Sequence, residues 1–283
     1  MNMQVKTYRA PAKINLCLHV LGRRADGYHE LAMAMQAVSL YDVVRIRVSG
    51  ERGVRVSCSG ITLPQGEINI AEKAARLLLD RMPIAPGVDI EIVKHIPVAA
   101  GLGGGSSDAA TVLLGLNEML NAGYSREALQ ELGSRLGADV PFFVFGHSAW
   151  ATGTGTQLEQ ISPLPQVAYL LVNPGISVST AEIYQSLQLT KGGELANLPR
   201  FSIVTREDLC HALANDLESV AIAKYPVIET IKQKLLEHGA MGTLMSGSGS
   251  TVFGVFESFE AACKAGESLA AISDWSVFPV EPL

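Results

Sequence analysis

The sequence has few of the features that mark membrane, secreted or nucleic-acid-binding proteins. None of its apolar runs approaches the ~20 residues that a membrane-spanning helix needs. The N-terminal segment MNMQVKTY lacks the apolar stretch of a secretory signal, so we expect a cytoplasmic protein. The net charge of −6 opposes binding to nucleic acid, which depends on lysine and arginine neutralising phosphates. We therefore expect neither a nucleic-acid nor a membrane partner.

Cysteine is also scarce. The four cysteines, Cys17, Cys58, Cys210 and Cys263, include no Cys-x-x-Cys pair. This spacing excludes a zinc knuckle and a disulfide-rich scaffold, because both place cysteines in close pairs or dense frameworks. We expect four reduced thiols.

The composition is typical of a large folded protein. Hydrophobic residues make up 48% and charged residues 18% of the 283, which is ordinary for a globular chain. Because a single core stops growing near ~250–300 residues, this length favours two domains. Two glycines and two prolines interrupt any regular pattern across residues 152–165, which predicts domains at residues 1–160 and 161–283. The sequence leaves open whether the protein is a monomer or a homodimer.

Hydrophobic periodicity predicts an α+β fold. In the first half we expect strands at residues 14–20, 43–48 and 88–93, and helices at residues 71–81, after residue 105, and at 125–137. In the second half we expect strands at residues 167–172, 243–245, 251–256 and 275–280. We expect several helices between residues 172 and 243, the longest at 226–239, and a further helix at 259–271. The β-α-β-β-α-β order of the second half predicts a ferredoxin-like domain.

The segment PVAAGLGGGSSDAA, residues 97–110, is a glycine-rich loop that runs into a helix. Glycine lets the backbone approach a ligand closely, and the free N–H groups of a helix N-terminus favour a phosphate. The apolar stripe of this helix consists of Val112, Leu113, Leu116, Met119 and Leu120. We expect Ser106 or Ser107 to be its N-cap. Residues 97–105, called the first glycine loop, are a predicted anion site, with an ordinary flexible turn as the alternative.

Two better-known phosphate motifs are absent. No Gly-x-x-x-x-Gly-Lys-Ser/Thr segment occurs, and the spacing of Gly101, Gly103 and Ser106 lacks the third small residue of a dinucleotide fingerprint. The spacing therefore disfavours a dinucleotide-dependent oxidoreductase.

Two further segments carry single residues suited to chemistry. Lys13 and Asn15 share one face of a predicted strand, opposite Ile14 and Leu16. A solvated polar face on an edge strand is the alternative. Asp139 is a carboxylate in apolar surroundings, where it must be hydrogen-bonded or paired. Its alternative role is to cap the turn that follows.

A last segment, SGSGST at residues 246–251, is called the second glycine loop and separates two predicted strands. A hairpin turn needs only two such residues, so this longer loop predicts close approach to a ligand, with a flexible hairpin as the alternative. Together these segments supply a phosphate cradle, a cation and a carboxylate. Phosphoryl transfer to an alcohol needs these parts.

The first glycine loop resembles the phosphate loop of the GHMP small-molecule kinases, and residues 246–254 resemble their C-terminal glycine motif. The segments PAKINL (11–16), GRRADGYHEL (22–31), GADVPFF (137–143) and NDLE (215–218) resemble the branch of that family that acts on cytidyl-diphosphate methylerythritol. The resemblance covers nearly the whole chain. It implies a ribosomal-protein-like α/β domain followed by a ferredoxin-like domain.

The resemblance implies an enzyme that uses ATP and Mg²⁺ to phosphorylate the 2-hydroxyl of that substrate in the non-mevalonate route to isoprenoids. It assigns Asp139 to orienting or deprotonating the hydroxyl and Lys13 to pairing with Asp139. The residues implied to contact ATP are Asn69, Lys94, Pro97, Gly101, Leu102, Gly103, Gly104, Gly105, Ser106 and Ser107, with Ser106 or Ser107 near the metal. Those implied to contact the substrate are Asn15, Tyr28, His29, Thr180, Tyr184, Gly247, Ser248 and Gly249.

Several alternatives stay open. A sibling kinase of mevalonate, homoserine or a sugar is disfavoured by the segment DGYH (26–29), because an acceptor without a nucleotide needs no cytosine slot. Tyr184 could be a core tyrosine, and Asn69 could cap the helix at residue 71 as well as contact adenine. A nucleic-acid-binding module is a further alternative, since the first domain of the family resembles a ribosomal-protein fold, but the acidic charge opposes it.

Overall fold

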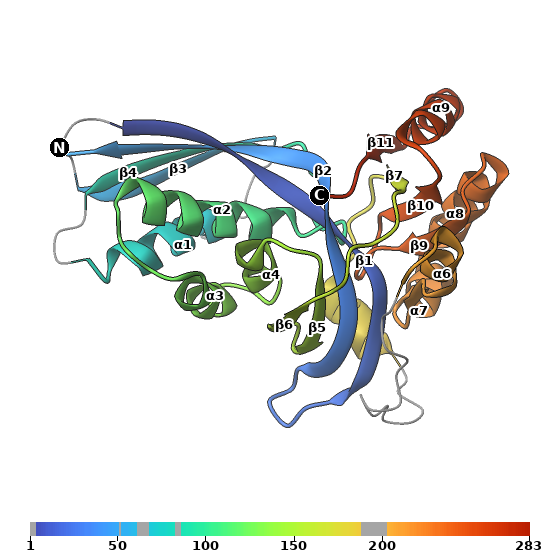
Figure 1. Ribbon diagram of the computed structural model, residues 1–283, viewed down its shortest axis with the longest axis horizontal. Coiled ribbons are helices and arrows are strands. Elements are labelled where there is room, and N and C mark those ends of the chain that lie inside the picture. Colours follow the sequence, from blue (N-terminus) through green and yellow to red (C-terminus); the bar gives the residue numbers. More distant parts are fainter. Residues whose placement is uncertain (1–3, 51, 61–67, 83–85, 188–202) are drawn as a thin grey trace. The chain divides into compact units, whose positions relative to one another are not determined.

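The computed structural model describes residues 4–50, 52–60, 68–82, 86–187 and 203–283, which form two compact units. The first unit takes Met1–Ala12, Leu40–Ile96 and Gly103–Gly146, and the second takes Lys13–Ser39, Pro97–Leu102 and His147–Leu283. Two long strands, β1 (Gln4–Arg23) and β2 (His29–Ser49), contribute residues to both units (Figure 1). The units therefore interleave along the chain, and the sequential split into residues 1–160 and 161–283 stays a prediction.

In the first unit, helices cover one face of a sheet (Figure 1). The strand order is β3 (Gly53–Ser59), β4 (Gly87–Val93), β2, β1, with β3 parallel and β2 antiparallel to β4. Helix α1 (Ile70–Leu79) packs on α2 (Gly104–Met119), and α1 also contacts β3. Buried side chains alternate along residues 42–48 of β2 and along β4, which gives this part of the sheet one buried, largely apolar face.

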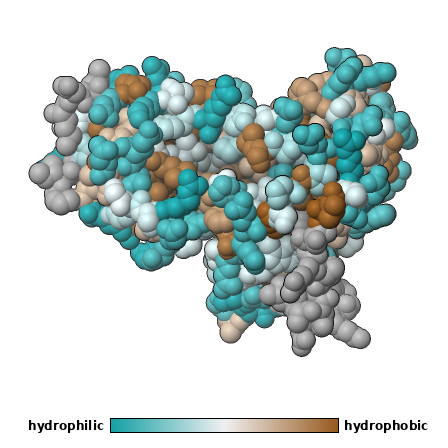
Figure 2. Space-filling model, viewed as in Figure 1, coloured by the Kyte–Doolittle hydropathy of each residue, from teal (hydrophilic) through white to brown (hydrophobic). Residues whose placement is uncertain are grey.

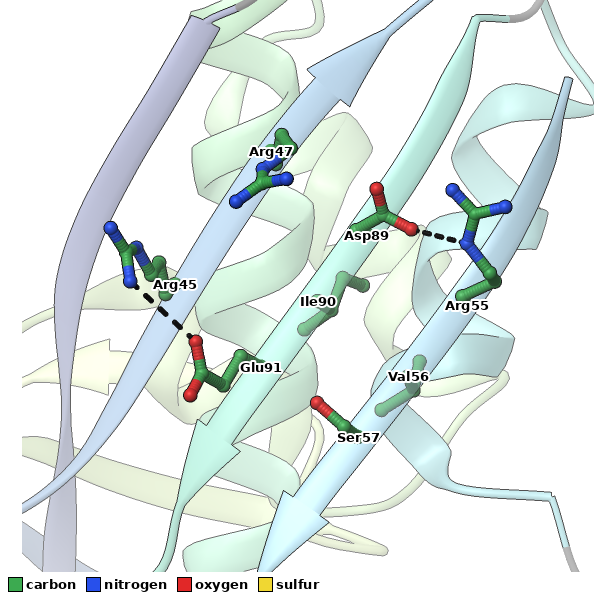
Figure 3. A pocket seen from close by; sticks show the side chains of 8 residues that line it. All are labelled: Arg45, Arg47, Arg55, Val56, Ser57, Asp89, Ile90 and Glu91. Carbon is green, nitrogen blue, oxygen red and sulfur yellow. Dashed lines mark hydrogen bonds and ion pairs between the residues drawn. The ribbon is translucent and has the colours of Figure 1, made fainter. Parts of the chain in front are cut away.

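The other face of this sheet carries charged side chains around a shallow hollow (Figure 3). Arg55 Nε lies 2.5 Å from Asp89 Oδ1, and Arg45 lies 3.7 Å from Glu91. Solvent-exposed pairs of this kind contribute about 1 kcal/mol or less. The charged residues on this face are the solvent-facing positions of the alternating pattern, and their ion pairs add little stability.

Helices α3 (Arg126–Ser134) and α4 (Val140–Phe145) pack on each other in the first unit. Ser125 caps α3, as predicted, because its hydroxyl accepts the Ala128 N–H at 3.3 Å. At the end of α3, Gly133 leaves no room for a side chain, since a Cβ there would lie 2.8 Å from Val140 Cγ1. This contact fixes the start of α4.

The second unit contains a four-stranded antiparallel sheet in the order β11 (Ser276–Val280), β7 (Ala168–Asn173), β10 (Val252–Phe256), β9 (Gly242–Met245). Helix α8 (Val227–Glu237) contacts β9 and β10, and α9 (Phe259–Ala270) contacts β7 and β11. Along the chain these six elements follow the order β-α-β-β-α-β. In the sheet the fourth strand, β11, lies beside the first, β7, and the second strand, β9, lies beside the third, β10. The predicted ferredoxin-like arrangement is confirmed.

The second unit also includes a hairpin and a short strand that the sequence did not indicate. The hairpin of β5 (Ala149–Gly153) and β6 (Gln157–Gln160) occupies part of residues 152–165, so the glycines there turn a regular hairpin rather than interrupt all structure. The strand β8 (Ala214–Asn215) pairs parallel to β1. Between residues 172 and 243, where several helices were predicted, the described part has three short helices besides α8: α5 (Thr180–Ser186), α6 (Arg206–His211) and α7 (Glu218–Lys224).

Two boundaries differ from prediction. Strands β1 and β2 span 20 and 21 residues, far beyond the expected segments 14–20 and 43–48. Along β1, residues 12–18 are buried on both faces, so the alternation that marks a half-buried strand is absent. Alternation therefore underestimates strands that are covered on both sides.

Hydrophilic residues predominate on the face shown in Figure 2, and hydrophobic ones occur there in small groups. Among the described residues, no helix combines the length and apolar character needed to cross a membrane. All four cysteines are free thiols, as predicted.

The contact between Gly133 and Val140 makes a testable prediction. Gly133→Ala would place a methyl group against Val140, and that overlap is relieved when the valine is shortened. Each single variant, Gly133→Ala and Val140→Ala, should lower the free energy of unfolding. We expect the sum of these two losses to exceed the loss in the double variant by about 0.5–3 kcal/mol. Urea denaturation measures all four proteins.

Gly50→Ala is the control, because a Cβ at Gly50 meets no atom within 4 Å. The losses of unfolding free energy in Gly50→Ala and Val140→Ala should therefore add up in the double variant. If the losses in Gly133→Ala and Val140→Ala also simply add, the tight contact between Gly133 and Val140 is contradicted.

Candidate active site

The first glycine loop contains three residues with left-handed backbone before α2: Ala99 (φ 51°), Gly101 (φ 77°) and Gly103 (φ 70°). Gly103 is the N-cap, and no side chain caps the helix. The expectation that Ser106 or Ser107 is the N-cap is therefore wrong: the left-handed glycine starts the helix earlier, so both serines fall in its first turn. The first backbone N–H groups of α2 have no acceptor inside the helix, which suits an anion.

In the second unit the two glycine loops touch backbone to backbone. A Cβ at Gly101 would lie 2.0 Å from the carbonyl oxygen of Ser246, so only glycine fits there. The Ser246 hydroxyl donates to the Gly101 carbonyl at 3.0 Å, and Thr251 N–H donates to the Ala100 carbonyl at 3.3 Å. Because Ser246, Ser250 and Thr251 are fully buried, the second glycine loop is a packed element rather than a flexible hairpin.

Lys13 and Asn15 do share one face of β1, and that face is buried. Lys13 is 4% exposed and Asn15 fully buried, so the alternative of a solvated edge strand is wrong. Lys13 Nζ donates to Asn15 Oδ1 at 2.5 Å. The backbone of both residues is held as well, since Lys13 N–H donates to the Leu102 carbonyl at 3.0 Å and Asn15 N–H to the Ser246 hydroxyl at 3.3 Å. The strand and both glycine loops thus form one hydrogen-bonded assembly in the second unit.

In the first unit, Lys94 lies between two buried carboxylates that sequence reasoning did not assign. Its ammonium pairs with Asp42 and, at 2.7 Å, with Asp108. Asp42 Oδ1 also accepts the N–H groups of His95 and Ile96, at 2.6 and 2.9 Å. The cluster ties the end of β4 to the first turns of α2.

The electrostatics of this cluster follow from burial. Burial raises the pKa of Asp108 from 3.8 to about 7, with a further contribution from the Asp42 charge, while the Lys94 ammonium opposes the rise. Burial disfavours the charge of Lys94, but the two carboxylates outweigh that effect and raise its pKa. Two carboxylates therefore share one ammonium.

Asn69 and Asp139 both stand at helix starts in the first unit. Asn69 caps α1, because its Oδ1 accepts the Ala71 N–H at 2.8 Å; the capping role is confirmed. Asp139 occupies the N-cap position of α4, yet its side chain makes no capping hydrogen bond. That alternative role for Asp139 is wrong, although Gly137 N–H and Val140 N–H close ordinary turns on either side of it.

In the second unit, the structure brings four of the residues predicted to contact the substrate into two contacts. The rings of His29 and Tyr184 stack with centroids 4.9 Å apart. The hydroxyls of Thr180 and Ser248 are 2.8 Å apart. Tyr184 is half-buried, so it is not the core tyrosine of the alternative, and Ile183 provides the buried contact of α5.

Of the remaining predicted residues, Tyr28 is 67% exposed and Leu102 is fully buried, so only the backbone of Leu102 can meet a ligand. Burial lowers the pKa of His29, and the charge of Arg23 lowers it further. Lys13 and Asp139 belong to different units, and their pairing stays a prediction.

Sequence reasoning missed two further residues that support the site, Asp42 and Asn173. It singled out the segment NDLE but gave Asn215 no role. Asp42 carried a usable signal, because it is in phase with the buried residues Val44 and Ile46 of its strand. Asn173 and Asn215 end their strands and begin turns, which is a weaker signal.

Comparison with known proteins places this chain among kinases. Models of the N-terminal and C-terminal domains of GHMP kinases match residues 69–147 and 195–272. A 4-diphosphocytidyl-2-C-methyl-D-erythritol kinase of Syntrophotalea carbinolica is 56% identical, covering 99% of both chains. The same kinase of Geobacter metallireducens is 53% identical over 99% of this chain and 100% of its own. A crystal structure of 4-(cytidine 5'-diphospho)-2C-methyl-D-erythritol kinase is 36% identical, with a TM-score of 0.83 and coverage of 98% and 99%.

The raised pKa of Asp108 predicts a pH-dependent stability. The folded protein holds this proton up to about pH 7, whereas the unfolded chain releases it near 3.8. Between these values the folded state binds more protons, so this group's contribution to stability falls as the pH rises. Asp108→Asn has no such proton to lose. We therefore compare the Tm of the variant with the Tm of the natural chain at each pH. We expect this difference to rise by at least about 2–4 °C as the pH goes from 5 to 8, which corresponds to about 1 kcal/mol of stability.

Thermal denaturation across that pH range tests this expectation. Asp89→Asn is the control, because the exposed Asp89 has a lowered pKa through its bond to Arg55 and should show no such rise. A constant Tm difference for Asp108→Asn would contradict it.

Proposed function

The chain belongs to the GHMP kinase family, and we propose that it transfers the terminal phosphate of ATP to the 2-hydroxyl of 4-(cytidine 5'-diphospho)-2-C-methyl-D-erythritol. The observation that carries the proposal is the match, over almost the whole chain, to relatives that bear this kinase's name. The product would serve the non-mevalonate route to isoprenoid precursors. A cytoplasmic location fits that role and remains part of the proposal.

The phosphates of ATP would lie at the start of α2. The N–H groups of the first turn have no helical acceptor, and Gly103 and Gly105 present no side chain that would keep an anion away. Asn69 and Lys94 were expected near adenine. Because the Lys94 ammonium already pairs with two carboxylates, we propose that its backbone, rather than its charge, faces the nucleotide.

Mg²⁺ would be held chiefly by the nucleotide. Among the described residues no group of three histidine, cysteine or acidic side chains could bind a metal, which fits Mg²⁺, because that ion keeps several waters and binds through substrate phosphates. Of the two serines, Ser107 is fully buried and Ser106 is half-buried. We assign the accessible Ser106 hydroxyl to the metal, which when bound offsets phosphate charge.

The catalytic contribution of the protein would be positioning and electrostatics. Lys13 would offset negative charge that develops during transfer, with its ammonium oriented by Asn15. Asp139 would orient or deprotonate the attacking hydroxyl. An ammonium beside a carboxylate favours the ionised form and makes it a weaker base, so orientation is the larger part of the proposed role.

The cytidine would be recognised away from the reacting atoms. Tyr28 offers an exposed ring for stacking, and Tyr184 with His29 supplies a second aromatic surface. Thr180 and Ser248, whose hydroxyls touch, would face the acceptor. A mevalonate or homoserine kinase has no use for this aromatic group, and that favours the cytidyl-diphosphate substrate.

Asp139→Asn tests the proposed catalysis. The amide keeps the size of the side chain but cannot take a proton or orient the hydroxyl as an anion does, so kcat should fall about 10²–10⁴-fold. The KM for ATP should change little. Turnover is followed as ADP release that depends on the cytidyl-diphosphate substrate, and mevalonate and homoserine should give none.

The matched control is Asp89→Asn on the outer face of the first unit's sheet, which should keep the natural kcat. Natural turnover in Asp139→Asn would refute the role assigned to Asp139. ADP release with mevalonate alone would refute the proposed substrate.

Tyr184→Ala tests recognition of the base. Loss of base–aromatic stacking is worth about 1–3 kcal/mol, so the KM for the substrate should rise about 5–150-fold while the KM for ATP stays constant. Tyr184→Phe retains the ring and should behave like the natural chain. An unchanged substrate KM in Tyr184→Ala would exclude the stacking role.

A further inference from the structure

The segment NDLE, residues 215–218, has no role in the proposed reaction, yet its side chains hold the second glycine loop. Asn215 Nδ2 donates to the carbonyls of Met245 and Gly247, at 2.7 and 2.8 Å. Its Oδ1 accepts the N–H of Leu217 at 3.0 Å, an Asx turn that fixes the orientation of the amide. Both donors and one acceptor lone pair of this side chain are therefore used.

Glu218 binds the same segment of backbone, at Met245. Its Oε1 accepts the Met245 N–H at 2.8 Å, and its Oε2 pairs with Lys232 at 2.5 Å. Asn215 and Glu218 thus bind the carbonyl and the N–H of one residue. Met245 is the last residue of β9 and directly precedes the loop.

A second asparagine holds the far end of the loop in the same manner. Asn173 Nδ2 donates to the Thr251 hydroxyl at 3.0 Å, while Asn173 Oδ1 accepts the Gly175 N–H at 2.9 Å. Ser250 adds a bond from its hydroxyl to the Ile176 carbonyl at 2.7 Å. Both ends of the second glycine loop are therefore fixed by amides that are themselves oriented by turns.

The second glycine loop in turn contacts Gly101 and Asn15, two residues expected near the reacting groups. The Ser246 hydroxyl lies between Met245 and Gly247, the two residues whose carbonyls Asn215 binds. That hydroxyl donates to the Gly101 carbonyl at 3.0 Å and accepts the Asn15 N–H at 3.3 Å. Since a Cβ at Gly101 would lie 2.0 Å from the Ser246 carbonyl oxygen, a small rotation of residues 245–247 must move the first glycine loop or collide with it.

From these contacts we propose that Asn215 is a positioning residue, which sets the backbone of residues 245–247 and thereby fixes Gly101 and Asn15 for phosphoryl transfer. The inference rests on the proposed function for the identity of the reaction. Only an amide serves here, because the site needs two donors toward carbonyls and one acceptor toward an N–H. A carboxylate would face two carbonyl oxygens and repel both.

The decisive variant is Asn215→Asp, which keeps the shape and the acceptor but loses both donors. At neutral pH we expect kcat to fall at least tenfold with a smaller change in either KM, because the substrates still bind to groups that have moved. As the pH is lowered, protonation returns one donor, so the activity relative to the natural chain should recover in part. A purely structural defect would lower the amount of folded protein without this recovery.

Asn117→Asp is the matched control. Asn117 Nδ2 donates to the Tyr124 carbonyl and its Oδ1 accepts the Tyr124 N–H, both at 3.0 Å, in the first unit. The same chemical change is made at a half-buried residue near the end of α2. We expect kcat within about twofold of the natural value, because a tenfold change would need about 1.4 kcal/mol in the activation free energy.

Amide hydrogen exchange supplies a readout that needs no activity. In Asn215→Asp, exchange should become faster at residues 245–251 and at residues 99–102, with no change in α9. If the natural chain shows no kinase activity on the proposed substrate, the proposed function fails, while the exchange data still decide whether Asn215 orders the first glycine loop.

If Asn215→Asp does not fold, Ser246→Ala decides the matter, because it leaves Asn215 in place and removes the hydroxyl between the loops. It should show the same loss of kcat and faster exchange at residues 99–102. Natural kcat together with natural exchange at residues 99–102, in either variant, would overturn the proposal.

Discussion

The site in the second unit depends on one close contact, in which the backbone of Gly101 meets the backbone of Ser246. No side chain can occupy position 101, because a Cβ would lie 2.0 Å from the Ser246 carbonyl oxygen and the left-handed φ of 77° also disfavours one. The Ser246 hydroxyl then satisfies the Gly101 carbonyl and the Asn15 N–H at once. A glycine-rich loop usually indicates freedom, but here glycine makes the chain rigid by letting two loops touch.

In the first unit, the start of α2 is fixed by charge instead. Two carboxylates and one ammonium would leave a buried negative charge near a helix end that is expected to attract phosphate. The raised pKa of Asp108, about 7, reduces that conflict, since a partly protonated Asp108 leaves the cluster close to neutral. Removing Lys94 would leave the buried carboxylates without their cation, which costs about 3–5 kcal/mol, whereas an exposed pair such as Arg55–Asp89 contributes about 1 kcal/mol or less.

Local signals in the sequence predicted helices α1, α2, α3, α8 and α9, the caps at Asn69 and Ser125, and the ferredoxin-like order of the second half. These features depend on residues within a few positions of each other. The N-cap of α2 was predicted wrongly, because serine side chains are the common signal and a left-handed Gly103 took the position. The pairing of Asn215 with residues 245 and 247 could not be read from the sequence, since it joins segments about thirty residues apart with no periodic signal.

Asp42 was within reach of the sequence, and its case shows what alternation can give. Inward residues of β2 fall at Val44, Ile46 and Val48, so the same phase places Asp42 inward. The phase of β4 likewise places Lys94 inward after Val88, Ile90 and Ile92. The pairing of Val43 with Val93 extends by one step to Asp42 opposite Lys94. A charged residue in phase with a buried stripe must find a partner, and two such residues of opposite sign on adjacent strands predict their own ion pair, whereas Arg45 and Glu91, one position out of phase, form a pair that water can reach.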